Sequence, residues 1–263
     1  MPRTCHVLRV FTSGEIGGNH LGVIEDPTGL DTMAMQGIAA HLGFSETTFV
    51  ESSTVDVPNI RIFTPNMELP FAGHPLVGTA WVLNVLGGAG LATLRCGVGE
   101  VGIRVDGDTV WVDAALDQPV SDAADMDLAR RAGLDAPVRS WLVEMPKRYV
   151  VVEYGDEASV TGASPDFDVL SEVFGTLVFS RFGNRVRARF FAPDAGVPED
   201  PATGSAAVAL AAALVSEGET SGAVSIDQGK ETGFPSRIEL EWTADAARIG
   251  GTVVLDEVRS LDM

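Results

Sequence analysis

The sequence predicts an α/β protein with two similar domains, and three observations point to this fold class. Strand-like and helix-like segments alternate along its 263 residues, as they do in mixed α/β and α+β folds. The length is enough for two cores of about 100 to 150 residues each. Segments of the first half also return in the same order in the second half. We therefore expect domains at residues 1–117 and 118–263, with the final strand a candidate to return to the first domain.

Two periodicities define the elements expected in the first half. Between residues 30 and 42 apolar side chains recur every four positions, with Asp31 and Thr32 in the first turn and Gly43 after the end, which predicts a surface helix. Residues 75–86 are apolar on nearly every side, and Pro75 suits a first helical turn, so a buried helix is expected there. Alternation of apolar and polar residues predicts strands at 5–11, 21–24, 46–51, 59–64, 91–96, 101–105 and 109–112.

The second half repeats this order after a polar, acidic and less regular segment at 118–135. We expect strands near Trp141 and Tyr149, a helix around 166–173, strands at 177–182 and 186–191, and a second very apolar helix. The pattern Arg61–Pro65 returns at Arg189–Pro193, and His74–Ala80 returns at Asp200–Ala206. This repeat is too long for a solenoid and predicts a duplicated domain, with His74 and Asp200 at equivalent helix starts.

Composition excludes several classes of function. A formal charge of −19 makes attraction to nucleic acid or to an anionic membrane improbable. The longest apolar run, 206–215, is too short for a membrane span, and the N-terminus lacks a signal-peptide core. Cys5 and Cys96 are isolated, which suggests neither a disulfide nor a metal site and fits a cytoplasmic protein. No phosphate-binding glycine motif occurs, so we expect no cofactor.

Each buried helix presents amide hydrogens at its start that lack intrahelical partners and favour anions. If the halves pack about a pseudo-twofold axis, both starts face one cleft. A small anionic substrate could then be held by the amides around Gly73 in one half and around Gly204 and Ser205 in the other.

Three side chains are candidates for acid/base roles. Glu46 begins a strand of Thr, Phe and Val, where burial would bring its titration towards neutrality, although a lone Glu at a strand start is commonly a solvated edge residue. His74 has the side chain best suited to proton transfer at neutral pH, and its alternative role is a helix cap. Asp200 is a favoured N-cap type and could merely satisfy the next turn.

Two glycine-rich loops border the expected cleft. In the first loop, the amide of Asn19 could bind a substrate carboxylate or simply stabilise its turn. The second loop runs from Gln228 to Arg237 and could be a connection or a wall of the cleft. Cys5 and Cys96 lie in expected strands, where buried and inert thiols are the better interpretation.

The motifs Pro70–Pro75, Glu199–Ala206 and Gly17–Asn19 together resemble the PhzF family of phenazine biosynthesis-like proteins. The similarity runs nearly end to end and includes Glu46 and the loop at Gln228. It implies the diaminopimelate epimerase-like fold, in which two similar domains each wrap a curled mixed sheet around a central helix. It also places the active site between the two domains.

The resemblance implies cofactor-independent isomerisation, of the type that moves a proton on trans-2,3-dihydro-3-hydroxyanthranilate. Glu46 takes the place of the family's acid/base glutamate. His74 and Asp200 match a pair that positions substrate or relays its proton, and Ser205 matches a substrate-binding serine. The family's frequent dimers imply a homodimer. Departures from the family pattern that border the expected cleft are His20, Ile16 and Phe234.

Two rival functions remain open from the sequence. One is a small-molecule binding protein that keeps the cleft but performs no chemistry. The other is an amino-acid epimerase or racemase that uses Glu46 opposite Asp200 or His74, since neither helix start carries the cysteine that related epimerases use.

Overall fold

The computed structural model describes residues 3–51, 57–122, 126–134 and 136–261. Two compact units form: the first comprises Met1–Asp113 together with Gly250–Met263, and the second comprises Ala114–Ile249. The chain therefore passes between the units twice, and its final strand ends in the first unit. The division into domains at 1–117 and 118–263 stays a prediction, because independent folding of these two segments is not tested by the structure.

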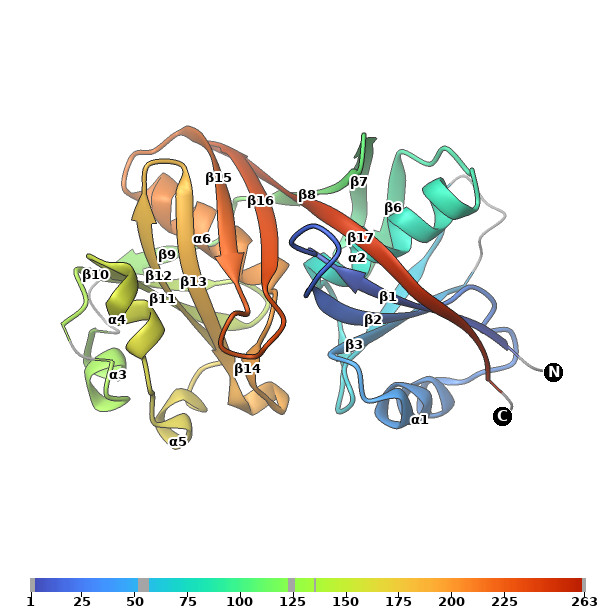
Figure 1. The fold of residues 1–263 in the computed structure, drawn as a ribbon, viewed down its shortest axis with the longest axis horizontal. Helices are drawn as coiled ribbons and strands as arrows, with labels where there is room; N and C mark the ends of the chain where they lie inside the picture. Colours follow the sequence, from blue (N-terminus) through green and yellow to red (C-terminus); the bar gives the residue numbers. More distant parts are fainter. Residues whose placement is uncertain (1–2, 52–56, 123–125, 135, 262–263) are drawn as a thin grey trace. The chain divides into compact units, whose positions relative to one another are not determined.

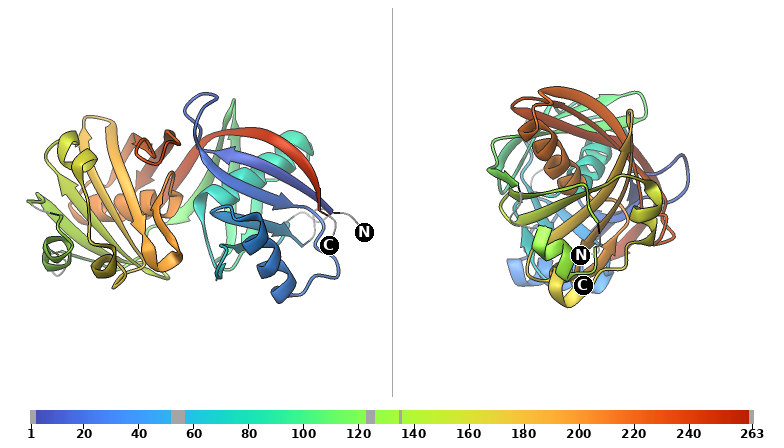
Figure 2. Two further views of the ribbon diagram at one scale, coloured as in Figure 1. Left: turned by 60° about the horizontal axis from the view of Figure 1, so that its bottom comes forward. Right: turned by 90° about the vertical axis from the view of Figure 1, so that its left-hand side faces the viewer.

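The sheet of the first unit is mixed. Strand β1 pairs antiparallel with β2 on one side and with β17 on the other, and Figure 2 shows β17 following β1. Strand β2 is parallel to β3, which is antiparallel to β4, and β5 pairs with β4. The strands are β1 Arg3–Val10, β2 Asn19–Ile24, β3 Glu46–Val50, β4 Ile60–Phe63, β5 Glu68–Leu69, β6 Thr93–Cys96, β7 Gly99–Asp106, β8 Thr109–Ala115 and β17 Ala246–Leu261.

Two helices cover this sheet. Helix α1 (Thr32–Leu42) was predicted, but Asp31 lies before its first turn and not within it: the Asp31 side chain accepts from the Ala34 amide, and Gly43 ends the helix at a φ of 67°. Helix α2 (Gly73–Trp81) continues as the π-helix η1 (Val82–Leu86). It packs against β1, β2 and β3, and Gly78 allows this approach, because a Cβ there would lie 2.9 Å from Val10 Cγ2.

The second unit repeats the pairing pattern of the first. Strand β10 is antiparallel to β11, β11 is parallel to β12, β12 is antiparallel to β13, and β14 pairs with β13. Strand β9 flanks β10, while β15 runs parallel to β13 and carries β16. The strands are β9 Val120–Asp122, β10 Arg139–Glu144, β11 Arg148–Tyr154, β12 Gly175–Phe182, β13 Arg185–Ala192, β14 Val197–Asp200, β15 Ser221–Gln228 and β16 Ser236–Thr243.

Helix α6 (Gly204–Ser216) is the central helix of the second unit (Figure 1). It contacts β10, β11, β12 and β16 and is buried along nearly its whole length, as its apolar composition predicts. The helix expected at 166–173 is reduced to α5 (Phe167–Leu170). The short helices α4 (Glu157–Gly162) and α3 (Met126–Arg131) were not predicted, because neither spans enough turns to show a helical period.

The fold class is confirmed: each unit is a mixed sheet with one buried central helix, and strands β10 to β14 before α6 repeat the pairing of β1 to β5 before α2. In the described part of the chain, no helix is long and apolar enough to cross a membrane.

Candidate active site

Glu46 and His74 lie together in the first unit. Glu46 is the first residue of β3, and His74 is the second residue of α2. His74 Nε2 is 3.1 Å from Glu46 Oε2, and the two side chains are only 4% and 15% exposed. Glu46 is therefore not a solvated edge residue, and His74 is not a helix cap, since the N-cap of α2 is Ala72.

The His74 ring is neutral. Complete burial lowers the pKa of His74 to about 3, and a hydrogen bond with the backbone of His20 acts in the opposite direction. Because that bond favours the charged ring, the His20 carbonyl accepts it from a ring N–H. Nε2 makes no hydrogen bond of proper geometry, so the donor is Nδ1. The lone pair of Nε2 then faces Glu46, as a proton acceptor would.

Asn19 is held beside this pair. It is the first residue of β2 and is 1% exposed, and its Oδ1 accepts a 2.8 Å hydrogen bond from Ser45 Oγ. Leu21, two residues on, is the strand partner of Glu46. The start of β2, the start of β3 and the first turn of α2 thus bring Asn19, Glu46 and His74 to one place in the unit.

His20 points away from this place. Side chains alternate along a strand: Leu21 packs on Gly78 of α2, whereas Gly22 faces Phe44 on the other side. The His20 ring lies on the same face of β2 as Gly22 and stacks on Phe44, with the ring centroids 5.8 Å apart. The His20 ring therefore lies on the face of β2 opposite α2, while its carbonyl orients His74, and whether His20 borders a cleft stays a prediction.

The other predicted residues gather in the second unit. Asp200 ends β14 and is 8% exposed, and its Oδ2 accepts a 2.5 Å hydrogen bond from Thr203 Oγ1. Gly204 and Ser205 form the first turn of α6. Ser205 Oγ accepts from the hydroxyl of Tyr149 at 3.0 Å.

The predicted equivalence of His74 and Asp200 is wrong in its register. Helix α2 begins one residue before His74, whereas α6 begins four residues after Asp200, and its N-cap is Thr203. By position in the helix, the counterpart of His74 is Ser205. The repeated sequence motif gave the wrong equivalence because the backbone at Pro201–Thr203 is not helical and α6 begins only after it.

Neither helix start is capped by a side chain: the N-cap residues Ala72 and Thr203 make no cap hydrogen bond. No N-cap side chain occupies the first amides of either helix, and a role of the amides around Gly73, Gly204 and Ser205 in binding an anion stays a prediction.

Thr203, Gln228 and Tyr149 belong to the second group of site residues, and sequence reasoning assigned none of them a role. Gln228 Nε2 donates to the Asp200 carbonyl at 2.8 Å and to Thr203 Oγ1 at 3.1 Å. Thr203 belongs to the motif Glu199–Ala206 and Gln228 begins the second glycine-rich loop, so both carry a signal in the sequence, but neither signal indicates a bond to Asp200. Tyr149 has no local signal, because it comes near Ser205 only where α6 packs on β11.

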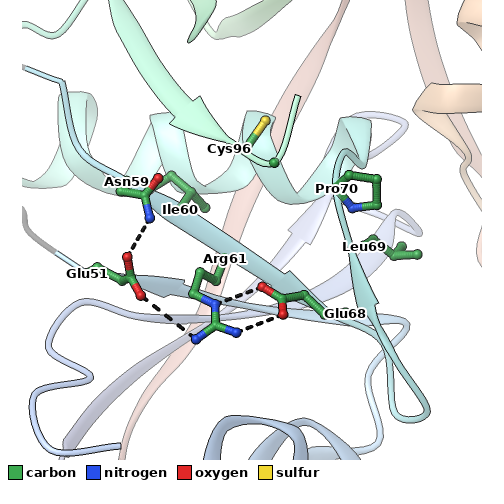
Figure 3. A pocket seen from close by; sticks show the side chains of 9 residues that line it. Glu51, Asn59, Ile60, Arg61, Glu68, Leu69, Pro70 and Cys96 are labelled. Carbon is green, nitrogen blue, oxygen red and sulfur yellow. Dashed lines mark hydrogen bonds and ion pairs between the residues drawn. The ribbon is translucent and has the colours of Figure 1, made fainter. Parts of the chain in front are cut away.

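A surface groove in the first unit lies elsewhere (Figure 3). On its floor Arg61 pairs with Glu68 through two 2.7 Å hydrogen bonds and lies 3.9 Å from Glu51. None of the described residues that line the groove is a predicted site residue. Its charges are paired with one another, so the groove does not indicate a ligand.

The thiols take no part in either group. Cys5 and Cys96 are buried and unpaired, and burial raises the pKa of Cys5 to about 11. Both thiols are thus protonated at neutral pH and poorly nucleophilic. Among the described residues no cluster of three or more His, Cys, Asp or Glu side chains could hold a metal ion.

The first group of site residues, Asn19, Glu46 and His74 in the first unit, can perform proton transfer. A neutral imidazole acceptor beside a carboxyl group can share one proton with it, and hydrogen bonds of this kind are often poorly aligned before substrate binds. The second group offers the Asp200 carboxyl group and the start of α6, whose N-cap side chain makes no cap hydrogen bond.

Comparison with known proteins gives three kinds of similarity. The family model for phenazine biosynthesis-like proteins matches residues 8–257. An uncharacterized isomerase of Mesorhizobium japonicum is 35% identical and covers 93% of this chain and 94% of its own length. The trans-2,3-dihydro-3-hydroxyanthranilate isomerase of Pseudomonas chlororaphis is 35% identical, covering 88% and 87% respectively. The crystal structure of a phenazine biosynthesis protein of Enterococcus faecalis superposes with a TM-score of 0.83 at 22% identity, covering 100% of both chains.

Proposed function

We propose that this protein, which belongs to the phenazine biosynthesis-like family and is an isomerase, moves a proton within a small carboxylate-bearing substrate without a cofactor. The observation that carries the proposal is the buried pair of Glu46 and His74, whose facing atoms are 3.1 Å apart. The named activity of the Pseudomonas chlororaphis relative suggests a ring like that of trans-2,3-dihydro-3-hydroxyanthranilate as the substrate class.

Glu46 is the acid/base residue in this reaction. Its carboxylate accepts a proton from one substrate carbon while the electron pair of that C–H bond shifts a double bond along the substrate. The resulting carboxylic acid returns a proton to another carbon. The atomic composition of the substrate is unchanged, and no oxidant or reductant is needed.

His74 tunes and orients Glu46. Its Nδ1–H is committed to the His20 carbonyl, so Nε2 presents a lone pair to Glu46. A neutral acceptor at this distance stabilises the protonated form of Glu46 and fixes which carboxyl oxygen carries the proton. Asn19, locked by Ser45, supplies a polar side chain beside the reacting carbon.

The substrate carboxylate is held by helix amides, and Asp200 contacts the substrate with Ser205. Support comes from the uncapped starts of α2 and α6, which carry partial positive charge. That both starts serve the same substrate stays a prediction, and a double-mutant cycle between His74→Asn and Ser205→Ala would test it through the coupling of their effects on kcat/KM.

The decisive experiment is proton exchange in heavy water. Wild-type protein is incubated with trans-2,3-dihydro-3-hydroxyanthranilate and a panel of cyclic and acyclic carboxylates, and deuterium at carbon is followed by NMR. Glu46→Gln should lower the exchange rate by a factor of about 10² to 10⁴, the usual share of a general acid/base. Exposed Glu100, which pairs with Arg95, provides the matched control Glu100→Gln, which should exchange like wild type.

An unchanged rate in Glu46→Gln would contradict the role of this residue. Retention of the double bond with loss of configuration at the exchanging carbon would instead identify an epimerase.

We further propose a cytoplasmic homodimer. Two buried unpaired thiols fit a reducing compartment, and cell fractionation would test the location. A monomer mass by light scattering at micromolar concentration would rule out the dimer.

A further inference from the structure

We propose that Thr203 and Gln228 are positioning residues that hold the Asp200 carboxylate in one orientation through a one-directional chain of hydrogen bonds. The inference rests on the proposed function, in which Asp200 contacts the substrate. All three residues lie in the second unit, and the sequence motif by itself assigns neither helper a role.

The topology of the sheet brings the three residues together. Strands β14 and β15 both pair with β13 and run towards each other along it, since β14 is antiparallel and β15 is parallel. Asp200 stands opposite Phe190, and Asp227 stands opposite Arg187. The ends of β14 and β15 therefore meet, and Gln228 arrives beside Asp200.

Gly229 allows the ends of β14 and β15 to approach each other closely. A Cβ at this residue, whose φ is +78°, would lie 2.5 Å from the Pro201 carbonyl oxygen. Only glycine permits both the left-handed backbone and this approach. The backbone that follows Gln228 is thus packed directly on the backbone that follows Asp200.

The Gln228 amide starts the chain of hydrogen bonds. The side chain is 1% exposed, so its polar atoms need protein partners. One partner is the Asp200 carbonyl oxygen, which can only accept, so the amide nitrogen must face it. The second hydrogen of Nε2 is donated to Thr203 Oγ1 at 3.1 Å. This bond fixes the direction of the next one.

The Thr203 hydroxyl donates the second hydrogen bond of the chain, to Asp200. A hydroxyl carries one hydrogen, and because Thr203 Oγ1 accepts from Gln228, that hydrogen is available to Asp200 Oδ2 at 2.5 Å. This distance is typical of a hydroxyl donating to a charged oxygen. Thr203 is the N-cap of α6, a position where threonine usually caps the helix, yet its hydroxyl makes no cap bond. The hydroxyl is used on Asp200 instead.

The consequence is a carboxylate with distinct oxygens. Oδ2 is held as an acceptor, so rotation of the carboxylate is restricted. The same hydroxyl would otherwise bind an α6 amide, so the arrangement also leaves that helix start available to an anion.

The test compares Thr203→Val, which removes the hydroxyl at nearly constant volume, with Thr203→Ser, which restores it. With trans-2,3-dihydro-3-hydroxyanthranilate as the probe, Thr203→Val should lower kcat roughly 10- to 100-fold and leave KM within about two-fold, because a misoriented group affects the transition state more than binding. Thr203→Ser should recover most of kcat. Gln228→Glu should lower kcat likewise, because it places an acceptor where a donor is required.

Thr176→Val is the matched control. Thr176 is a buried threonine of the same unit whose hydroxyl has no hydrogen-bond partner among the described residues, so kcat should not change. In an Asp200→Asn background, Thr203→Val should cause little further loss, since the two changes act on one interaction.

The outcomes separate the two proposals. Unchanged kcat in both Thr203→Val and Gln228→Glu, with Asp200→Asn impaired, would overturn the positioning role and leave the proposed function intact. Full activity in Asp200→Asn, or no deuterium exchange by wild type on any probe, would overturn the proposed role of Asp200 and this inference with it.

Discussion

At the scale of single residues, burial decides the chemistry of the candidate site. An exposed histidine beside a glutamate would form an ion pair, but His74 is fully enclosed, and burial is the largest influence on its ring. The 3.1 Å approach to Glu46 is therefore between a carboxyl group and a neutral imidazole. A carboxyl group beside a neutral imidazole acceptor can share one proton with it, which is the arrangement that proton transfer needs.

The neutral state of His74 predicts a pH dependence of stability. The pKa of His74 is about 3 in the folded protein and near 6.5 when unfolded, so between these values the unfolded state binds the additional proton. The free energy of unfolding should then fall as pH falls from 6.5 towards 3, by about 1.4 kcal/mol per pH unit at most from this residue.

Urea unfolding at several pH values measures this slope. His74→Asn should flatten it, whatever its effect on overall stability, whereas His41→Asn at an exposed position of α1 should not. An equal slope in His74→Asn and wild type would mean that the ring is not held neutral.

At the scale of elements, the two central helices are specified by small residues as much as by large ones. Helix α6 buries a nearly continuous run of alanines, and α2 places Gly78 against Leu21 and Val10. Close approach of helix to sheet puts the first turn of α2 within reach of the start of β3. The distance between His74 and Glu46 thus depends on a glycine one turn further along the helix.

Gly78→Ala should therefore destabilise the protein despite the higher helix propensity of alanine. The new Cβ would meet Val10 Cγ2 at 2.9 Å and Leu21 more closely still, and such overpacking costs about 1 to 3 kcal/mol. Gly37→Ala in α1 is the matched change, since nothing lies within 4 Å of its Cβ. It should stabilise by roughly 0.5 to 1 kcal/mol. Chemical denaturation of both variants compares them, and equal effects would contradict this packing argument.

At the scale of the whole molecule, the chain path makes the two units unequal. The second unit is one continuous segment, Ala114–Ile249, while the first needs the returning residues Gly250–Met263. Those residues supply the part of β17 that pairs with β1 from Arg3↔Leu261 to Val10↔Val253. Without them β1 would have an unpaired edge, which is prone to association.

Fragments of the chain should reflect this difference. Residues 114–249 expressed alone should fold, with a cooperative denaturation transition followed by circular dichroism. Residues 1–113 alone should not, and fusion of 250–263 through a flexible linker should restore their folding. Cooperative folding of 1–113 without the final strand would show that β17 is dispensable to the first unit.

Much of the fold could be predicted because it rests on local patterns. The glycine at position 43 and the apolar faces of α2 and α6 all lie within a few residues of the features they determine. The short helices α3 and α4 escaped prediction, since a helix of six residues has too few turns to show a period. The predicted equivalence of His74 and Asp200 was wrong because two similar sequence motifs can begin their helices at different positions within the motif.

The amino-acid sequence alone was sufficient to identify the family, the two-part α+β architecture and the acid/base candidates, because motif residues and periodicity are properties of the chain order. It could not establish that His74 is neutral, that its Nε2 faces Glu46, or that Gln228 and Thr203 bind Asp200. Desolvation and hydrogen bonding depend on which groups are neighbours in space. Glu46 and His74 are 28 residues apart in the chain, and so are Asp200 and Gln228. Strand pairing and helix packing bring them together, and that arrangement follows from the folded structure as a whole.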